Sequence, residues 1–306
     1  MSICVVFLGT GAAVPTPQRS LPAVLLQRGN EQLMFDCGEA VQRQMMIAKV
    51  GLHKKLGIYI THMHGDHVLG LPGLLQTMAL MDRKKPVEIY GPEGLGYFFD
   101  CLRETLQFQL TFQANVHEIA EPGVVYDEEE YTVTATRSNH AATSFSYAFT
   151  EKPRPGRFHP EKAKALGVPL GEAWSKLQHG KEFVFPNGRI IKPEDVSNAP
   201  RKGRKFVYTG DTKPFEGFAG FAADADMVVH ESTFDDALAE KAELDTHSTP
   251  SQAAAQAKAA NAKSLVLTHI SARYSDTTLL LEQAKKIFPN TVVAEDFLEL
   301  ELPLSE

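Results

Sequence analysis

Short apolar runs rich in β-forming residues recur along the chain, and most of them end in Gly, Asp or His. Longer segments with helical periodicity lie between several of these runs. Strands that alternate with helices predict a layered α/β fold. The expected helices cover 70–82, 93–106, 249–262 and 276–288. The expected strands are CVVFLG (4–9), QLMFDCG (32–38), GIYITH (57–62), VEIYG (87–91), FVYTGD (206–211), MVVHES (227–232) and SLVLTH (264–269).

One of these strands leads directly into THMHGDH (61–67), which holds four side chains able to bind a metal ion. Imidazole and carboxylate ligands suit zinc, manganese or iron. Four ligands within six positions can hardly all bind one ion, so His62 and His64 are assigned to one metal and Asp66 and His67 to a neighbouring one. Two ions about 3.5–4 Å apart are a known device for displacement at phosphorus. The cluster therefore predicts a two-metal site at the end of a strand, with a helix expected from Val68.

Further metal ligands are expected where other strands end. His140 closes TVTATRSNH, Asp211 closes KFVYTGD and His269 closes SLVLTH. Binding residues gather at such strand ends in α/β proteins. A carboxylate such as Asp211 can bridge two cations, whereas Asp36 in FDCGE is expected to support the ligands rather than bind a metal.

The cysteine content excludes a thiolate metal site. Cys4, Cys37 and Cys101 form no CxxC pair and no even set, so a disulfide framework is not indicated either. No apolar run approaches the roughly 20 residues that span a bilayer, and ICVVFL (3–8) is interpreted as a buried strand rather than a signal sequence. We therefore expect a cytoplasmic protein without a membrane partner.

Charge is distributed unevenly along the chain. The net charge of −7 argues against a nucleic-acid partner when taken alone. Residues 152–205, however, contain thirteen Lys or Arg against five Asp or Glu, a local net charge of +8 that leaves −15 for the remainder. Seven prolines exclude one regular element here. The segment is interpreted as a basic arm projecting from an acidic body, and the alternative is a solvated insertion without function.

Together these motifs identify a resemblance to the metallo-β-lactamase superfamily. Within it, the chain is similar to the short form of tRNase Z (ribonuclease Z), the endonucleases that trim the 3′ trailer from precursor tRNA. The resemblance runs nearly end to end, from FLGTGA to DFLEL. The motifs that carry it are HMHGDH (62–67), NH (139–140), GDT (210–212), HEST (230–233), HST (247–249) and THISARY (268–274).

The resemblance implies a fold, a cofactor and an assembly. The fold is an α/β protein of the four-layer αβ/βα metallo-β-lactamase type, one domain over 1–306 with a flexible basic arm inserted at 152–205. The cofactor is two Zn²⁺ per subunit, with Mn²⁺ or another divalent ion as a substitute. The assembly is a homodimer in which one subunit's arm grips the tRNA cut by the other. The implied ligands are His62, His64 and His140 for one zinc, Asp66, His67 and His269 for the other, and Asp211 as the bridge.

The same resemblance assigns roles in catalysis. Asp66 would orient or deprotonate the attacking water, whose pKa the zinc ions lower. His247 is the candidate general acid for the leaving ribose 3′-oxygen, and Glu231 would fix its tautomer. Glu231 and Thr249 also fit a plainer interpretation as residues at the starts of helices. The candidates for holding phosphate oxygens are Ser248, Thr249 and Arg273.

The function expected on this basis is a zinc-dependent endoribonuclease that acts on precursor tRNA. It would leave a tRNA 3′-hydroxyl and a trailer with a 5′-phosphate. The alternative within enzymes is a general metal-dependent phosphodiesterase or another hydrolase of the superfamily, such as a lactonase or sulfatase. An alternative of another class is an RNA-binding protein with a vestigial metal site, against which the complete ligand set argues.

Overall fold

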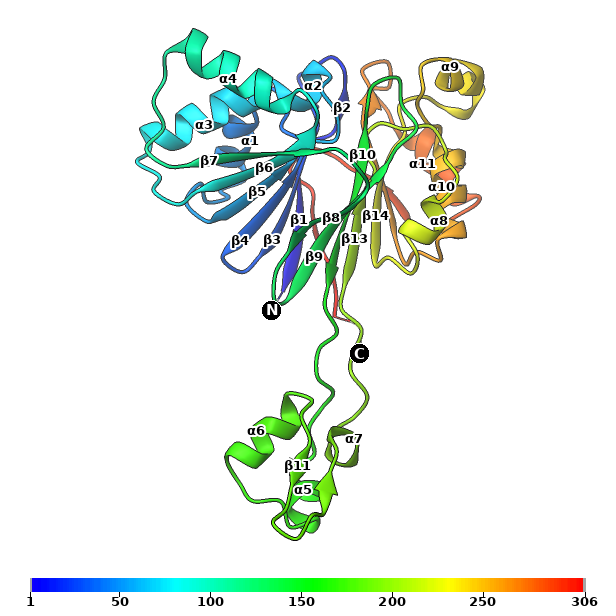
Figure 1. Cartoon of the computed structure of the whole chain (residues 1–306). Coiled ribbons are helices and arrows are strands. Elements are labelled where there is room, and N and C mark those ends of the chain that lie inside the picture. The colour runs from blue at the N-terminus through cyan, green and yellow to red at the C-terminus, as the bar shows by residue number, and fades with distance from the viewer. Residues whose placement is uncertain (1, 305–306) are drawn as a thin grey trace.

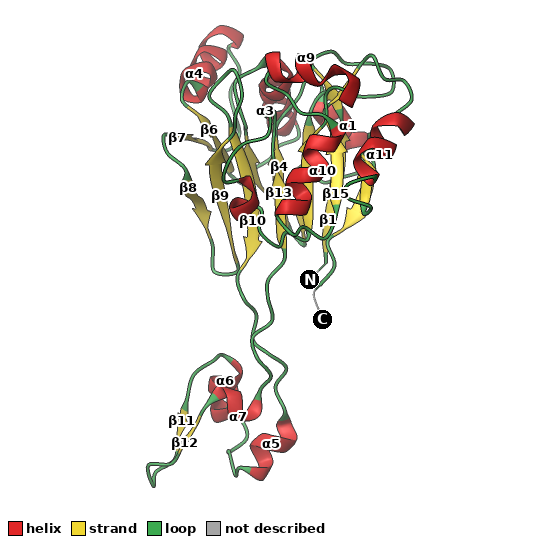
Figure 2. Ribbon diagram, turned by 90° about the vertical axis from the view of Figure 1, so that its right-hand side faces the viewer, coloured by secondary structure: helices red, strands yellow, loops and turns green. Residues whose placement is uncertain are grey.

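The computed structural model describes residues 2–304, which form two sheets packed face to face with helices outside them (Figures 1 and 2). In order, the first sheet contains β18 (Glu299–Glu301), β1 (Ile3–Gly9), β3 (Ala23–Arg28), β4 (Glu31–Phe35), β5 (Lys55–Tyr59), β6 (Val87–Pro92) and β7 (Ala114–Ile119). The second contains β17 (Thr291–Val293), β15 (Leu265–Thr268), β14 (Met227–Glu231), β13 (Lys205–Tyr208), β10 (Phe145–Glu151), β9 (Tyr131–Arg137) and β8 (Gly123–Asp127).

Helices cover the outer face of each sheet. The first sheet is covered by α1 (Val41–Ile47), α3 (Gly70–Leu80) and α4 (Leu95–Leu106). The second is covered by α8 (Phe218–Phe221), α10 (Pro250–Ala259) and α11 (Thr278–Lys285). Short helices α2 (Gly65–Val68) and α9 (Ala239–Leu244) lie in the connecting loops. This is the four-layer αβ/βα arrangement, which confirms the predicted fold class. None of the helices within residues 2–304 has the length and apolarity needed to cross a membrane.

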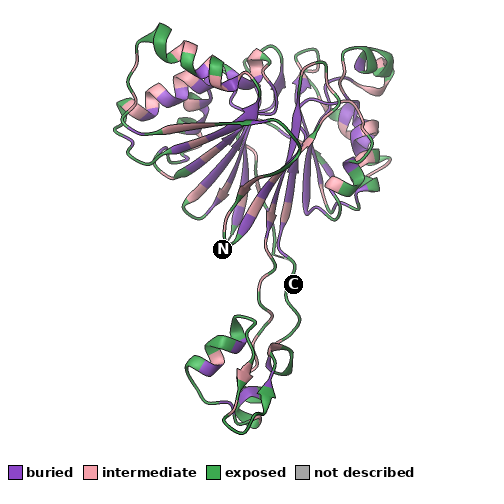
Figure 3. Ribbon diagram, viewed as in Figure 1, coloured by how far each residue is buried: buried purple, intermediate pink, exposed green. Residues whose placement is uncertain are grey.

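The layers explain why the strands appear in the sequence as nearly continuous apolar runs. In β1, Val5 and Phe7 face the opposite sheet, whereas Val6 and Leu8 face the helices, and all four are fully buried. A strand buried on both faces loses the alternation of apolar and polar residues. Aromatic rings fill the space between the sheets, where Phe35 of the first sheet packs at a tilt against Phe206 of the second. Figure 3 shows this buried interior in contrast to the exposed outer surface of the helices.

Most predicted elements lie within a few residues of their expected bounds, but the turn after the histidine cluster differs. The helix expected from Val68 is preceded by the extra turn α2, which begins at Gly65. Asp66 and His67 are therefore helical residues, and their side chains leave the chain in a different direction from those of His62 and His64. At α10, the Thr249 side chain accepts the N–H of Gln252, as expected of a helix cap.

The segment between β10 and β13 projects from the body as an arm, residues 152–204 (Figures 1 and 3). We call residues 152–159 and 196–204 the stalk and residues 160–195 the tip. The tip contains α5 (Pro160–Ala165), α6 (Glu172–Gln178), β11 (Phe183–Val184), β12 (Ile190–Ile191) and most of α7 (Pro193–Val196). The arm has a small core of its own, made by Ala163, Val168, Ala173, Leu177, Ile191 and Val196.

Both sheets direct the ends of their parallel strands toward one edge of the sandwich. Strands β4 to β7 are parallel, and so are β13, β14, β15 and β17. Hydrogen bonds join the sheets at this edge: the Tyr147 hydroxyl donates to the carbonyl of Ile60 at 2.7 Å, and the Phe145 N–H donates to that of Thr61 at 2.9 Å. Beside it, β2 (Gly11–Ala12) pairs with β16 (Ile270–Ser271). Segments far apart in the sequence are thus held together at this edge.

Candidate metal centre

Seven predicted ligands converge at this edge of the sandwich. Four follow β5, one precedes β10, one follows β13 and one follows β15. Because β10 is antiparallel to β13, its first residues lie at the same edge as the ends of the parallel strands. The potential ligand atoms form three groups, each with its atoms within 4.8 Å of one another, and the third (Asp211, His247 and His269) overlaps the other two. The first group is His62, His64, His140 and Asp211, and the second is Asp66, His67 and His269.

The first group is built from three rings and one carboxylate. His140 Nε2 lies 3.3 Å from His64 Nδ1, and His62 Nε2 lies 3.7 Å from Asp211 Oδ2. The His140 Nδ1–H donates to the carbonyl of Thr246 at 3.0 Å, so its Nε2 is the nitrogen with a lone pair. Three imidazoles therefore direct nitrogen atoms toward one point.

The second group lies beside Asp211, which belongs to the first. Asp66 Oδ2 lies 3.5 Å from the Nε2 atoms of both His67 and His269. Asp211 Oδ2 lies 3.3 Å from His67 Nε2, and its Oδ1 lies 3.3 Å from His269 Nε2. The backbone N–H of Ala13 donates to Asp66 Oδ2 at 2.9 Å and holds this carboxylate in place. Asp211 thus lies between the two groups, as a bridging carboxylate must.

These residues fit a pair of metal ions. Two nitrogens bound at about 2.0–2.1 Å to one tetrahedral zinc would be about 3.3 Å apart, close to the spacing of His64 and His140. Several ligand atoms are buried without a hydrogen-bond partner, which costs free energy unless a cation is bound. Those atoms are Nε2 of His62, His67 and His269, and Oδ1 of Asp211.

Asp36 orients ligands of both groups from behind. Its fully buried carboxylate accepts the Nδ1–H of His67 at 2.7 Å and the hydroxyl of Tyr208 at 2.9 Å. It also accepts both the N–H and the hydroxyl of Thr61, whose oxygen in turn accepts the Nδ1–H of His62 at 2.9 Å. Hydrogen bonds of this kind fix the tautomer, so that Nε2 is free to bind a metal ion. Asp36 therefore supports predicted ligands and contributes none of the grouped potential ligand atoms.

Two threonines that the sequence did not single out do the same for other ligands. Thr233 Oγ accepts the Nδ1–H of His269 at 2.8 Å and donates to Glu231 at 2.7 Å. Thr246 contacts His140 Nδ1 through both its carbonyl and its hydroxyl, at 3.0 and 2.9 Å. Their only signal in the sequence is adjacency, since Thr233 completes HEST and Thr246 precedes HST.

His247 and Glu231 form an ion pair beside the second group. His247 Nδ1 lies 2.8 Å from Glu231 Oε1, and its ring lies 5.4 Å from that of His269, centroid to centroid. Burial alone would lower the pKa of His247, but the Glu231 carboxylate raises it to about 9. Burial alone would raise the pKa of Glu231, but the His247 contact holds it below its usual value. The pair can therefore keep a proton on the imidazole.

The three candidates for binding phosphate lie in different environments. Ser248 is fully buried, and its hydroxyl donates to the carbonyl of Thr212 at 2.6 Å. Thr249 is buried as the cap of α10. Arg273 is exposed, and its guanidinium lies over the Phe234 ring at 4.8 Å, shortly after the predicted ligand His269 in the chain. Among the three, Arg273 has its charge at the surface of the site.

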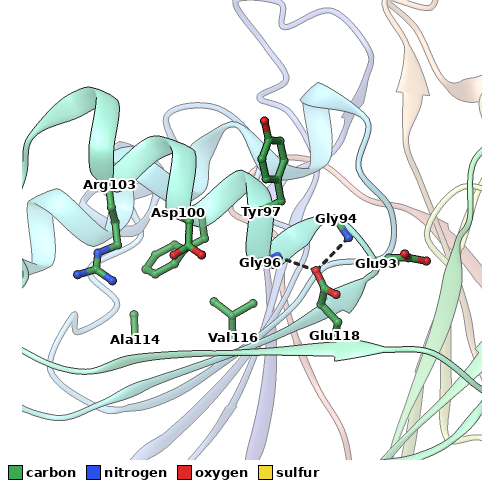
Figure 4. Close-up of a pocket in the computed structure, with 10 residues that line it drawn as sticks. Glu93, Gly94, Gly96, Tyr97, Asp100, Arg103, Ala114, Val116 and Glu118 are labelled. Carbon is green, nitrogen blue, oxygen red and sulfur yellow. Dashed lines mark hydrogen bonds between the residues drawn. The ribbon is translucent and has the colours of Figure 1, made fainter.

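A groove of 790 Å³ between α4 and β7 lies outside this centre (Figure 4). There the Glu118 carboxylate points at the start of α4 and accepts the N–H groups of Gly94 and Gly96, both at 2.9 Å. This carboxylate therefore caps a helix. None of the groups of metal-ligating side chains found in residues 2–304 includes a residue of this groove.

Sequence comparisons identify the relatives of this chain. The family described as "Anti-Pycsar protein Apyc1" matches residues 3–153, and the "Beta-lactamase superfamily domain" matches residues 197–270. Most of the arm, including its whole tip, lies between the two matches. A ribonuclease Z of Methanosarcina acetivorans is 46% identical over 98% of both chains, and one of Haloferax volcanii is 43% identical over 100% of this chain and 97% of its own.

A solved structure supports the same relationship. The crystal structure of human tRNase Z, short form, matches with a TM-score of 0.74 and 32% identity over 98% of this chain and 100% of its own. The metallo-β-lactamase fold protein YhfI from Bacillus subtilis matches with a TM-score of 0.69 at 19% identity, which speaks for the fold. With identities above 40% over almost its whole length, the chain belongs to the ribonuclease Z family.

Proposed function

We propose that this metal-dependent endoribonuclease removes the 3′ trailer from precursor tRNA at a centre of two zinc ions. The attacking water forms a bond to phosphorus, and the bond from phosphorus to the ribose 3′-oxygen breaks. The products are a tRNA with a 3′-hydroxyl and a trailer with a 5′-phosphate. The observation that carries this proposal is the convergence of seven nitrogen and oxygen ligands with the His247–Glu231 pair beside them. Precursor tRNA as the substrate also favours a cytoplasmic location.

Each metal position is assigned its own set of ligands. His62, His64 and His140 would hold one ion, the second group would hold the other, and Asp211 would contact both. Nitrogen and oxygen donors of this kind accept zinc and also manganese. When bound, the ions supply a water of lowered pKa and neutralise charge on the phosphodiester.

The chain's own residues then move the protons. Asp66, held by the Ala13 N–H, orients the attacking water and accepts its proton. His247 donates a proton to the leaving 3′-oxygen, because Glu231 keeps its imidazole protonated and in one tautomer. Arg273 lies where it can contact a phosphate oxygen, whereas Ser248 and Thr249 position the backbone around Glu231 and α10.

The arm is proposed to bind the body of the tRNA, and its position favours a homodimer. His140 precedes β10 and Asp211 follows β13, whereas the arm leaves from the opposite ends of these two strands. Seven extended residues of β10 span roughly 20 Å, so the arm starts far from the metals of its own subunit and points away from them (Figure 1). An arm placed in this way can bind a tRNA whose trailer is cut at the metal centre of a second copy of the chain.

The experiment that tests the function is to incubate metal-loaded protein with end-labelled precursor tRNA and to map the cut. One cut at the start of the trailer, with a 3′-hydroxyl on the tRNA, is expected. Hydrolysis of bis(p-nitrophenyl) phosphate without cleavage of precursor tRNA would instead identify a general phosphodiesterase. Binding without either reaction would identify a binding protein.

Removing the arm is expected to weaken precursor tRNA cleavage alone. Arg154 and Arg201 exchange both backbone hydrogen bonds, at 2.9 and 2.8 Å, so an Asn-Gly turn can replace 155–200 and close a hairpin. We expect kcat/KM for precursor tRNA to fall about 10²-fold because a second, linked contact is lost. Hydrolysis of bis(p-nitrophenyl) phosphate is expected to stay at the native rate, and an equal loss on both substrates would contradict this role of the arm.

The same variant tests whether subunits share their arms. Mixing and co-refolding the arm-deleted chain with an Asp211→Asn chain should restore cleavage of precursor tRNA. In the mixed dimer, the arm of the metal-deficient subunit can serve the intact centre of the other. Activity no greater than the sum of the two separate variants would contradict a shared arm.

A further inference from the structure

The arm joins the body through a cluster of buried charged side chains. Arg28 of β3, Glu151 at the end of β10 and Arg204 just before β13 are exposed by only 6%, 5% and 1%. Arg204 donates through Nε and Nη2 to the two carboxylate oxygens of Glu151, both at 2.7 Å, and Arg28 Nε approaches the same carboxylate at 3.4 Å. A bidentate guanidinium–carboxylate pair fixes the relative orientation of the two side chains as well as the distance between them.

This cluster connects five parts of the chain. Arg28 belongs to the first sheet, whereas Glu151 and Arg204 are the residues from which the two strands of the stalk leave the second sheet. Arg28 Nη2 also donates to Glu130, in the turn between β8 and β9, at 2.8 Å. Arg204 Nη1 donates to the carbonyl of Leu302, near the end of the chain, at 3.1 Å. We call Glu151 and Arg204 the roots of the stalk. Both roots are thereby bonded to residues of, or next to, both sheets.

Backbone contacts along the stalk continue the orientation that the buried cluster fixes at its base. A Cβ atom on Gly203 would lie 1.9 Å from the carbonyl oxygen of Glu151, so the two roots cross in direct backbone contact. Farther out, Arg154 and Arg201 exchange two backbone hydrogen bonds, and Asn198 N–H donates to the carbonyl of Arg157 at 2.9 Å. The stalk is therefore a paired ribbon rather than two independent linkers.

The orientation of the arm matters for tRNA binding because the tip carries little net charge to attract a polyanion. Residues 160–195 carry six Lys or Arg against five Asp or Glu, a net charge of only +1. Long-range attraction between the tip and tRNA is consequently weak. The stalk must therefore hold the tip where it can contact the tRNA.

We propose that the Arg28–Glu151–Arg204 cluster is a positioning element for the substrate, which sets the angle of the arm and thereby the affinity for tRNA. This inference rests on the proposed function of the arm. Burial alone would raise the pKa of Glu151, but the hydrogen bonds from Arg204 and Arg28 keep it below its usual value, so the carboxylate is ionised. Without that charge, two buried guanidinium groups repel one another and the roots lose their shared acceptor.

The test uses the full-length chain with Glu151→Gln, which keeps the shape but removes the charge. We expect KM for precursor tRNA to rise about tenfold, since a less directed arm has a lower effective concentration at its binding surface. The kcat for precursor tRNA and the hydrolysis of bis(p-nitrophenyl) phosphate should keep their native values. A role in stability alone would move both substrates together. Glu88→Gln, which removes one carboxylate charge from a hydrogen bond with His117 on the body, is the control and should match the native protein throughout.

Small-angle X-ray scattering of the free protein gives a second measurement. Glu151→Gln should broaden the distribution of interatomic distances at its long end, whereas Glu88→Gln should superimpose on the native profile. Native scattering together with a native KM for Glu151→Gln would overturn the proposal. If the native chain fails to cut precursor tRNA, the proposed function fails, whereas the scattering still decides whether the cluster sets the angle of the arm.

Discussion

Replacing Asp211 with asparagine is expected to lower the turnover of both precursor tRNA and bis(p-nitrophenyl) phosphate by at least about 10³-fold. Asp211 is the carboxylate that approaches ligands of both groups, at 3.3 Å from His67 and from His269 and at 3.7 Å from His62. An amide keeps the volume but removes the negative charge that balances two dications. Loss of this one side chain should therefore affect both metal positions, whichever substrate is offered.

Metal content gives a readout independent of turnover. Elemental analysis of the purified Asp211→Asn protein should show less than the two zinc ions per chain expected of the native protein. Asp226→Asn is the matched control, since Asp226 is also a buried aspartate of the second sheet but lies at the opposite end of β14, bonded to the backbone N–H of Lys205. The control should retain its zinc. Native turnover by Asp211→Asn would refute the assignment of this residue as a shared ligand.

The convergence of the predicted ligand residues could be anticipated because local sequence and fold agree at the strand ends. A strand buried on both faces must be an apolar run, so a polar metal-binding residue that closes such a run stands out, as His269 does after SLVLT. Parallel strands bring such endings to one edge. The predicted separation of His62 and His64 from Asp66 and His67 matches the first and second groups of potential ligand atoms, although the short helix α2 between the two pairs was not predicted.

The supporting hydrogen bonds could not be predicted in the same way. Thr246 is 106 residues from His140, and Thr233 is 36 residues from His269, so only the packed sheets bring them together. Neither threonine belongs to a periodic pattern. Thr246 and His269 also adopt positive φ angles of 60° and 55°, a conformation that favours glycine and that no propensity argument assigns to threonine or histidine.

The distribution of charge over the arm could not be predicted from the sequence either. The sum of +8 over residues 152–205 treats all cations as one surface, but Arg204 is buried against Glu151 and Lys205 is the first residue of β13. Lys152 and Lys202 also pair with acids of the body. A linear count cannot separate cations that face solvent from those that anchor a segment. The tip itself therefore keeps only +1 of the +8 counted over the whole segment.

Replacing His247 with alanine is expected to slow precursor tRNA cleavage about 10³-fold, in the range expected for loss of a general acid. The ribose 3′-oxygen leaves poorly as an alkoxide, and the imidazole paired with Glu231 at 2.8 Å is the group in place to protonate it. The nitrophenolate of bis(p-nitrophenyl) phosphate leaves as a stable anion and needs no proton. Its hydrolysis should therefore fall much less, by under about tenfold.

The comparison of the two substrates separates proton donation from support of the metal site. His247 also contacts the ring of His269, so a purely structural role would slow both substrates equally and lower the zinc content. Glu231→Gln should reproduce the selective loss more weakly, because an amide still bonds to Nδ1 but no longer favours the charged imidazole. An equal loss on the two substrates in His247→Ala, with native zinc content, would remove this histidine as the acid and leave the 3′-oxygen to be protonated by water.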